Sequence, residues 1–369
     1  MSLNLINKMR SKYIYIHIIL YYMDIVGKIV AMLIVGALSL LVYAACVHQP
    51  EILERFESPS SLRPISDAMN KLPLREYCVK SSYNSALTDK NTIDVKNVKL
   101  MLSKGCRFLD FEIFLIDNGA YVASSTDSSF SNITSTNHAP LNDVLKHVVM
   151  HAFSAPSPNS SDPLFVNFRI KTKSTLLYNM IGMAVSKYLK SYLVDGRVTG
   201  DTTLDTLMQK IVLVVDTQSS PSYANADYYP NCAQTQTQTQ TQTQTQTQTQ
   251  TQTQCYNLAN FVNIESGTRE LRQYKCNSLL RQATNPPMVI DSDKPHTDVS
   301  LLRLVEPESA VDLGNADAMY LMLNYGAQFI PNRFYINDRN GKEYDAIFAK
   351  HRTAFVPFVD ILHSAPQTT

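Results

Sequence analysis

The chain has 369 residues, and its 33 lysines and arginines nearly balance its 32 aspartates and glutamates. A general nucleic-acid-binding protein carries a basic excess, so this balance argues against one and against nucleic acid as a partner. Hydrophobic residues make up 44% of the chain and charged residues 18%, which excludes a wholly disordered protein. Six cysteines are too few for a disulfide scaffold. Motifs of nucleotide-binding loops and zinc sites are missing from the sequence.

An uncharged apolar run at residues 29–47 separates the N-terminus from the rest. A helix of this length can cross the ~30 Å hydrocarbon core of a bilayer, so we predict a transmembrane signal-anchor helix. A cleaved signal peptide and a buried core helix are the alternatives. Basic residues precede the run and glutamates follow it, which predicts a cytosolic segment at 1–28. We therefore expect a single-pass membrane protein with its bulk on the lumenal or extracellular side, or in a virion membrane if the chain is viral.

Residues 48–75 carry proline, serine and mixed charges, and we predict a stalk there. Beyond them, short apolar runs alternate with stretches of helical spacing. The expected strands are 106–116, 164–170, 211–215, 261–264, 299–305 and 327–336, and the expected helices are 141–153, 176–193 and 316–324. This alternation predicts parallel βαβ units and an α/β fold.

A perfect Gln-Thr repeat occupies residues 234–254. It has no apolar residue to bury, so we predict a disordered polar linker, with β-structured aggregation as the lesser alternative. Cys232 and Cys255 flank the repeat and are a candidate disulfide in an oxidising compartment; two unrelated free cysteines are the equal alternative. Asn132 and Asn159 begin Asn-X-Ser/Thr triplets and are candidate glycosylation sites.

Five segments together carry a resemblance to one known family. They are residues 77–87 (YCVKSSYNSAL), 104–112 (KGCRFLDFE), 143–153 (DVLKHVVMHAF), 164–171 (LFVNFRIK) and 303–315 (RLVEPESAVDLGN). In this order they resemble the catalytic barrel of phosphoinositide-specific phospholipase C, of the PLC-like phosphodiesterase superfamily. The resemblance implies a TIM-type (β/α) barrel with an X-like half at 76–233, the repeat as linker, and a Y-like half at 255–369.

The resemblance also implies a reaction that depends on two histidines. The position of the first histidine is occupied by Tyr83, and that of the second by Ala123 or Ser124. Tyrosine, with a pKa near ~10, is a poor proton shuttle at neutral pH, and neither alanine nor serine replaces an imidazole. His138 lies in the same connection as the second position and could substitute for it, although a solvated loop histidine is the usual outcome.

The family's calcium ion would be held at Asn84, Asp110 and Glu112, but Arg169 stands in place of a further carboxylate ligand. A guanidinium there repels a metal and supplies its own charge. Because Asp110 and Glu112 are two apart on one strand, we predict that Arg169 pairs with one or both of them. The alternative is that Arg169 points outward.

Two further positions bear on the site. Arg303 corresponds to the family's arginine that contacts substrate phosphate. His147 and His151 share one face of a predicted helix at i, i+4, where a metal pair is conceivable, but HVVMH lacks the glutamate of HExxH.

These departures favour a catalytically inactive, membrane-anchored barrel with a structural, scaffolding, or head-group- or protein-binding role, without a cofactor. The alternative is an active phosphoric diester hydrolase of the phosphatidylinositol type that uses a rearranged site, with Ca²⁺ as its cofactor.

Overall fold

The computed structural model describes residues 61–126, 132–224, 256–282, 302–308 and 314–364, with four helical positions at Met23, Gly27, Met32 and Gly36. The chain divides into two units, residues 1–58 and 59–369. Most of the predicted membrane helix, the Gln-Thr repeat, Cys232 and Cys255 lie outside the described residues. A search of the described part of the chain finds no helix long and apolar enough to span a bilayer.

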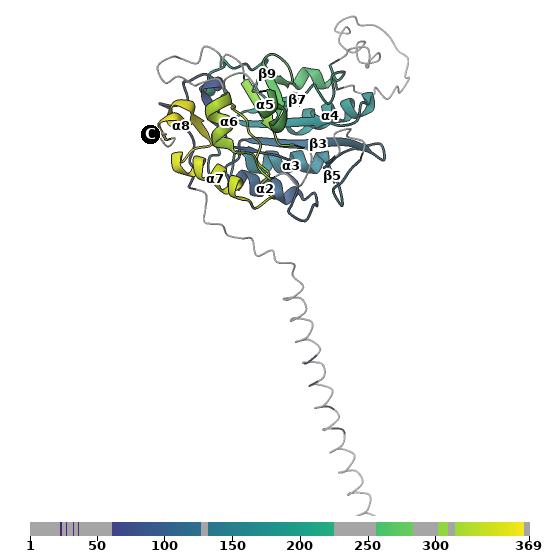
Figure 1. The fold of residues 1–369 in the computed structure, drawn as a ribbon. Helices are drawn as coiled ribbons and strands as arrows, with labels where there is room; N and C mark the ends of the chain where they lie inside the picture. Colours follow the sequence, from purple (N-terminus) through teal and green to yellow (C-terminus); the bar gives the residue numbers. More distant parts are fainter. Residues whose placement is uncertain are drawn as a thin grey trace, which may run out of the picture. The chain divides into compact units, whose positions relative to one another are not determined.

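A parallel sheet forms the centre of the second unit (Figure 1). Its neighbouring strands are, in spatial order, β2 (Ser81–Ser82), β3 (Phe108–Ile116), β6 (Leu164–Ile170), β7 (Ile211–Asp216), β8 (Ile264–Ser266), β9 (Leu271–Lys275) and β10 (Leu302–Glu306). Two shorter strands, β4 (Gly119–Ala123) and β5 (Ala139–Pro140), extend β3 in antiparallel pairing. Strand β1 (Tyr77–Val79) pairs antiparallel with β11 (Phe355–Pro357).

Residues 328–332 close this sheet into a barrel. On one side the Phe329 amide donates to the Arg303 carbonyl at 3.0 Å, and the Val305 amide donates to the Phe329 carbonyl at 2.9 Å. On the other side the amide of Val79 donates to the carbonyl of Gln328 at 2.8 Å, and that of Asn332 to Ser81 at 2.9 Å. The backbone groups of the first and last barrel strands are thereby satisfied, which confirms the predicted α/β architecture with a parallel sheet.

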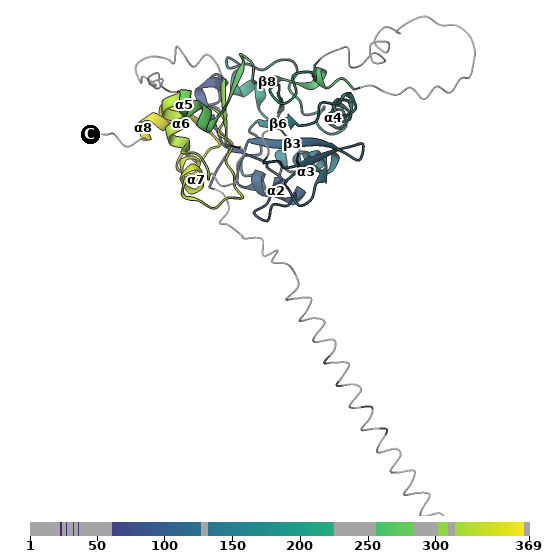
Figure 2. The same ribbon diagram turned by 45° about the vertical axis from the view of Figure 1, so that its right-hand side comes forward.

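Helices surround the barrel (Figure 2). They are α2 (Val95–Ser103), α3 (Leu141–Ala152), α4 (Thr175–Tyr188), α5 (Cys276–Gln282), α6 (Ala318–Tyr325), α7 (Arg339–His351) and α8 (Phe358–Ser364), with 3-10 turns at Leu74–Glu76, Leu204–Leu207 and Leu258–Phe261. Aspartates begin several of them: Asp94 accepts from the Lys96 amide at 2.8 Å, and Asp338 from the Gly341 amide at 2.7 Å. The predicted helices at 141–153 and 316–324 are thus confirmed.

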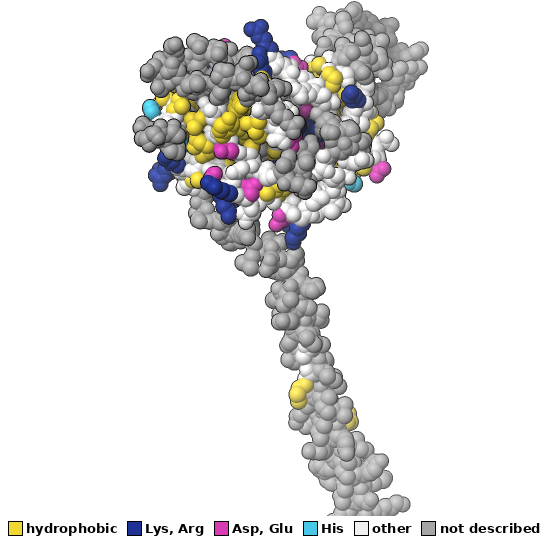
Figure 3. Space-filling view, viewed as in Figure 1, with side chains coloured by type: hydrophobic (Ala, Val, Ile, Leu, Met, Phe, Trp, Pro, Cys, Tyr) yellow, Lys and Arg dark blue, Asp and Glu magenta, His cyan; other side chains and the backbone are white. Residues whose placement is uncertain are grey.

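The base of the barrel is filled by apolar side chains. Phe329 packs against Phe108 and Phe165, with ring centroids 4.9 and 5.2 Å apart. Two further apolar clusters lie between the sheet and its helices, one around α2 to α4 and one around α6 to α8. Figure 3 shows hydrophobic side chains at the surface over α6 and its neighbours; Leu280 and Tyr320 are more than two-fifths exposed.

The range predicted for the stalk, residues 48–75, includes residues that belong to the folded unit. Leu62, Ile65 and Leu74 are buried, and the Ile65 amide donates to the carboxylate of Asp162 at 2.9 Å. Residues 61–75 therefore pack on the barrel, because burying their few apolar side chains in its core is favourable.

Candidate functional site

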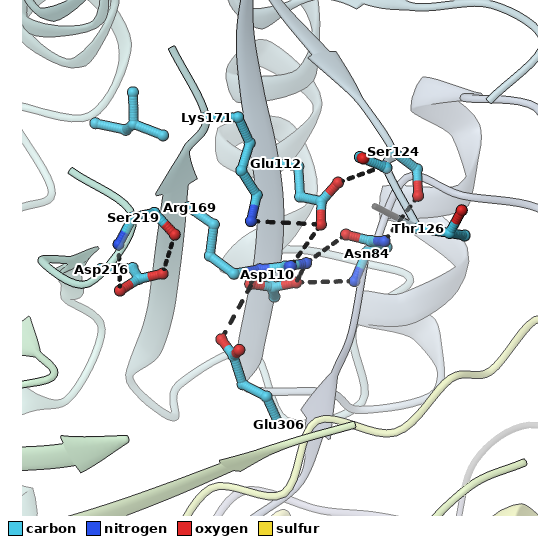
Figure 4. A network of polar contacts seen from close by, with 12 residues as sticks. Asn84, Asp110, Glu112, Ser124, Thr126, Arg169, Lys171, Asp216, Ser219 and Glu306 are labelled. Atoms are coloured by element: carbon cyan, nitrogen blue, oxygen red, sulfur yellow. Dashed lines mark hydrogen bonds and ion pairs between the residues drawn. The ribbon is translucent and has the colours of Figure 1, made fainter. Parts of the chain in front are cut away.

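Polar and charged side chains gather inside the barrel, from the middle of β3 and the carboxyl-terminal half of β6 (Figure 4). Asp110 and Glu112 project from β3, and Asn167 and Arg169 from β6. The two strands are paired so that Asp110 lies beside Asn167 and Glu112 beside Arg169. Since successive side chains of a strand alternate between its faces, all four reach the same interior space.

The guanidinium of Arg169 lies at the centre of this space and uses all of its donors. Its Nε donates to Asp110 Oδ1 at 2.8 Å, its Nη1 to Tyr83 Oη at 2.8 Å and to Glu112 Oε1 at 2.5 Å, and its Nη2 to Asn84 Oδ1 at 2.6 Å and to Asp110 Oδ2 at 2.5 Å. The predicted pairing of Arg169 with both carboxylates is thereby confirmed. The alternative prediction, in which the side chain of Arg169 points outward, is wrong.

This cluster is shut off from water. The side chains of Arg169, Asp110 and Glu112 are each 1% exposed. Burial alone would lower the pKa of Arg169, but the attraction of Asp110, with Tyr83 and Glu112, outweighs it and holds that pKa well above the ordinary value. Arg169 is therefore a permanent cation that neutralises the buried carboxylates.

Neighbouring groups hold the carboxylates in place. Asn167 Nδ2 donates to Asp110 Oδ1 at 2.8 Å, and the amide of Asn84 donates to Asp110 Oδ2 at 3.0 Å. The amide of Ser125 donates to Glu112 Oε2 at 2.6 Å. The backbone of Asn84 adopts a φ of +44°, in the left-handed region that asparagine tolerates better than most residues. These contacts fix the carboxylate positions independently of Arg169.

The two positions expected for histidines are also buried. Tyr83 accepts a hydrogen bond from Arg169 and presents its ring face to that guanidinium, 4.2 Å from the ring centroid. Burial raises the pKa of Tyr83 well above its usual range, so its phenol stays protonated at neutral pH. Ser124 accepts from Asn84 Nδ2 at 3.0 Å, and Ala123 is a buried residue at the end of β4.

The histidines of the described segments lie elsewhere. His138 is exposed, and its ring packs edge-on against Tyr121 at 4.7 Å. His147 and His151 lie on α3. Asn84, Asp110 and Arg169 have no hydrogen bond to any histidine in the described part of the chain, so geometry assigns none of these imidazoles to the cluster.

A second set of charged residues completes the barrel mouth, which is the interior space around Arg169. The sequence did not predict these residues. Glu306, on β10, accepts from Lys275 Nζ at 2.7 Å, and its Oε1 is 3.9 Å from Arg169 Nε. Burial would raise the pKa of Glu306, but Lys275 and Arg169 lower it to about 2. Lys171 Nζ is 3.9 Å from Glu112 Oε1; burial and then the like charge of Arg169 lower the pKa of Lys171 to about 8.

Asp216 ends β7 beside this set. Its carboxylate accepts from the hydroxyl of Ser219 at 2.5 Å and from the amide of Gln218 at 2.8 Å. Burial, followed by Glu306, raises its pKa. The sequence held a signal for Lys171, because it lies two residues after Arg169 and alternate residues of a strand share a face. The sequence around Glu306 and Asp216 holds no signal that they lie near Arg169.

Arg303 does not join the cluster. Leu302 and Leu304 pack in the apolar base of the barrel, and Glu306 reaches Arg169. Arg303 therefore projects from the opposite face of β10, with Val305, which packs in the cluster around α6 to α8. Arg303 therefore lies apart from the Arg169 cluster, and its contact with a substrate phosphate stays a prediction.

The two candidate glycosylation sites differ. Asn132 is exposed. Asn159 is fully buried, donates to the carbonyl of Gly105 at 3.2 Å and accepts from Arg107 Nη2 at 2.9 Å. A glycan cannot be attached to this amide within the folded barrel, so the Asn159 assignment is wrong for the folded protein.

The implied calcium site does not fit a metal here. Asn84, Asp110 and Glu112 do converge, but they converge on the guanidinium of Arg169, and a second cation there would meet that charge at close range. Among the described residues, no group of three or more His, Cys, Asp or Glu side chains is arranged to hold an ion.

Comparison with known proteins agrees with this architecture. Residues 69–216 match the family model of the phosphatidylinositol-specific phospholipase C X domain, which confirms the resemblance seen in the sequence. Residues 69–216 are therefore similar to the X domain of that family. No curated protein matches the chain.

Two solved structures have a similar fold. The structure of L. pealei PLC21 has a TM-score of 0.54 at 16% identity, and that of S. officinalis PLC21 has a TM-score of 0.52 at 16% identity. Each match covers 78% of this chain but 37% of the other, so the chain spans little more than a third of their length. At this identity, the likeness establishes the fold alone.

Proposed function

We propose that this chain is a catalytically inactive PLC-like barrel, held at a membrane by residues 29–47, with a structural or binding role. One observation carries the proposal: the buried guanidinium of Arg169 fills the space between Asn84, Asp110 and Glu112 and donates to all three. An ion that neutralises a reacting phosphate has no place there.

The remaining groups do not supply the missing chemistry. The donors of Arg169 are fully used, so none is directed at a phosphoryl oxygen. Tyr83 is protonated and already accepts from Arg169, so it is a poor base at neutral pH. The cations Arg169 and Lys171 face the carboxylates of Asp110, Glu112 and Glu306, and this balance gives no strong attraction for a phosphodiester.

A second candidate is the active phosphoric diester hydrolase with a rearranged site, and one observation favours it. Lys171 lies at the carboxyl end of β6, where barrels of this type place functional groups, and its pKa of about 8 leaves part of the amine neutral at neutral pH. A neutral amine can act as a general base.

Cleavage of phosphatidylinositol vesicles by the full chain, with and without calcium, tests both candidates. We expect no release of head group in either condition. Turnover without calcium that disappears in Lys171→Met would establish the second candidate instead. Calcium-dependent turnover would contradict the proposal that the protein is catalytically inactive.

The membrane placement is tested separately, by protease treatment of sealed vesicles that contain the full chain. Protection of the barrel without detergent supports a lumenal or extracellular placement, and digestion without detergent contradicts it. The lipid bilayer is then the partner of residues 29–47, and a head group or a protein is the expected partner of the barrel.

A further inference from the structure

Two histidines on α3 lie outside the barrel mouth and take no part in the proposed function. His147 and His151 are one helical turn apart, on the flank of a helix whose Val144 and Val148 are buried. Their ring centroids are 5.9 Å apart, with the ring planes at 52°. Both side chains are partly exposed.

Their ring nitrogens have an unused capacity for ligation. Nδ1 of His147 and Nδ1 of His151 are both buried, and neither has a hydrogen-bond partner. Orphaned buried nitrogens are costly in a native protein, and a metal ion or water removes the cost.

We propose that His147 and His151 form a binding site for a first-row transition-metal ion of the zinc type. Zinc binds an imidazole nitrogen at about 2.0–2.1 Å, so two rings that share an ion stand with their centroids about 5 to 6.5 Å apart. The observed 5.9 Å lies in this range. Imidazole is a ligand that suits zinc, copper and nickel rather than calcium or magnesium.

The local charge sets the character of the site. Lys99 on α2 lies close enough to His151 to act on it electrostatically. The ammonium of Lys99 opposes a cation. Two protein ligands leave the other coordination positions to water or to a group from another molecule. The site is therefore open and exchangeable, rather than a closed structural site.

Zinc titration of the chelator-treated full chain tests the proposal, by calorimetry and by the melting temperature. We expect zinc to raise the melting temperature, and His147→Ala or His151→Ala to weaken binding by about tenfold or more. His147→Gln is a second variant that keeps a polar side chain. The exposed His138→Ala is the matched control and should bind as the parent does. Lys99→Gln should bind zinc more tightly, because a like charge is removed.

The outcomes are decisive. Absence of both heat and thermal stabilisation at millimolar zinc would overturn the proposal. Equal binding by the parent, His147→Ala and His151→Ala would place the zinc elsewhere on the chain and overturn it as well. Phosphatidylinositol cleavage does not enter this test, so its failure is distinguishable from that of the proposed function.

Discussion

Replacing Arg169 with methionine removes the cation at the centre of the barrel mouth and keeps much of its volume. Asp110 and Glu112, each 1% exposed, would lose the group that donates to both of them. Loss of one partner from a buried ion pair costs about 3–5 kcal/mol, because the remaining charge is left uncompensated in a dry environment. We expect the free energy of unfolding of Arg169→Met to decrease by an amount in this range. The two carboxylates would then repel each other, and the nearest other cation, Lys171, is 3.9 Å from Glu112.

Urea unfolding of the parent and the variant measures this cost. Arg169→Met combined with Glu112→Gln should recover part of the loss, because the remaining carboxylate then has no charged neighbour of like sign on its own strand. Arg339→Met is the control: Arg339 pairs with Glu343 on the surface, and its loss should change the unfolding free energy little. A loss below about 1 kcal/mol for Arg169→Met would refute the reasoning, because the pair would then behave as an exposed one.

The reverse charge gives a second measurement at the same position. Arg169→Glu places a carboxylate among Asn84, Asp110 and Glu112, which together resemble a calcium-ligand set. Calorimetry should show calcium binding by this variant and none by the parent. Tight calcium binding by the parent would contradict the exclusion of the ion by Arg169.

Three further predictions follow from other parts of the chain. The pKa of Lys171 is about 8 in the folded protein and 10.5 in the unfolded chain, so the unfolded chain holds more protons between these values and the free energy of unfolding rises with pH across them, by about 3 kcal/mol. Urea unfolding at several pH values should show that Lys171→Met removes this rise, whereas Lys173→Met, at an exposed position, keeps it. Gly182→Ala would place a Cβ 2.5 Å from the carbonyl oxygen of Tyr256, so its melting temperature should fall, and an unchanged value would mean that residue 256 does not pack on α4. Deletion of residues 236–252 should leave the melting temperature nearly unchanged, because loop-closure entropy varies only with the logarithm of loop length; a large decrease would show that the repeat packs.

Local patterns in the sequence were sufficient for several features. The strands around Asp110 and Arg169 were predicted because apolar runs bounded by turn residues identify buried strands, and α3 because its apolar residues recur at helical spacing. The pairing of Arg169 with Asp110 and Glu112 needed more than local rules. Strand alternation placed Asp110 and Glu112 on one face, and the family resemblance placed Arg169 beside them.

Other features depended on contacts between distant parts of the chain. Glu306 and Lys275 reach the barrel mouth from strands more than 100 residues after Arg169, and no local pattern reports that proximity. Arg303 shows the limit of a motif comparison. Its neighbours in the sequence fit the motif, but Leu302, Leu304 and Glu306 face the barrel interior, and Arg303 alternates with them along β10.

Hydrophobic periodicity in the sequence predicted the α/β class of the fold, because periodicity is a property of short segments, and the resemblance to a known family placed Arg169 beside Asp110 and Glu112. Only the tertiary structure decided that residues 328–332 close the barrel, that residues 61–75 pack on it, and that Asn159 is buried and bonded to Arg107. These outcomes depend on which surfaces meet when the chain closes on itself, and burial is a property of the whole assembly rather than of any segment.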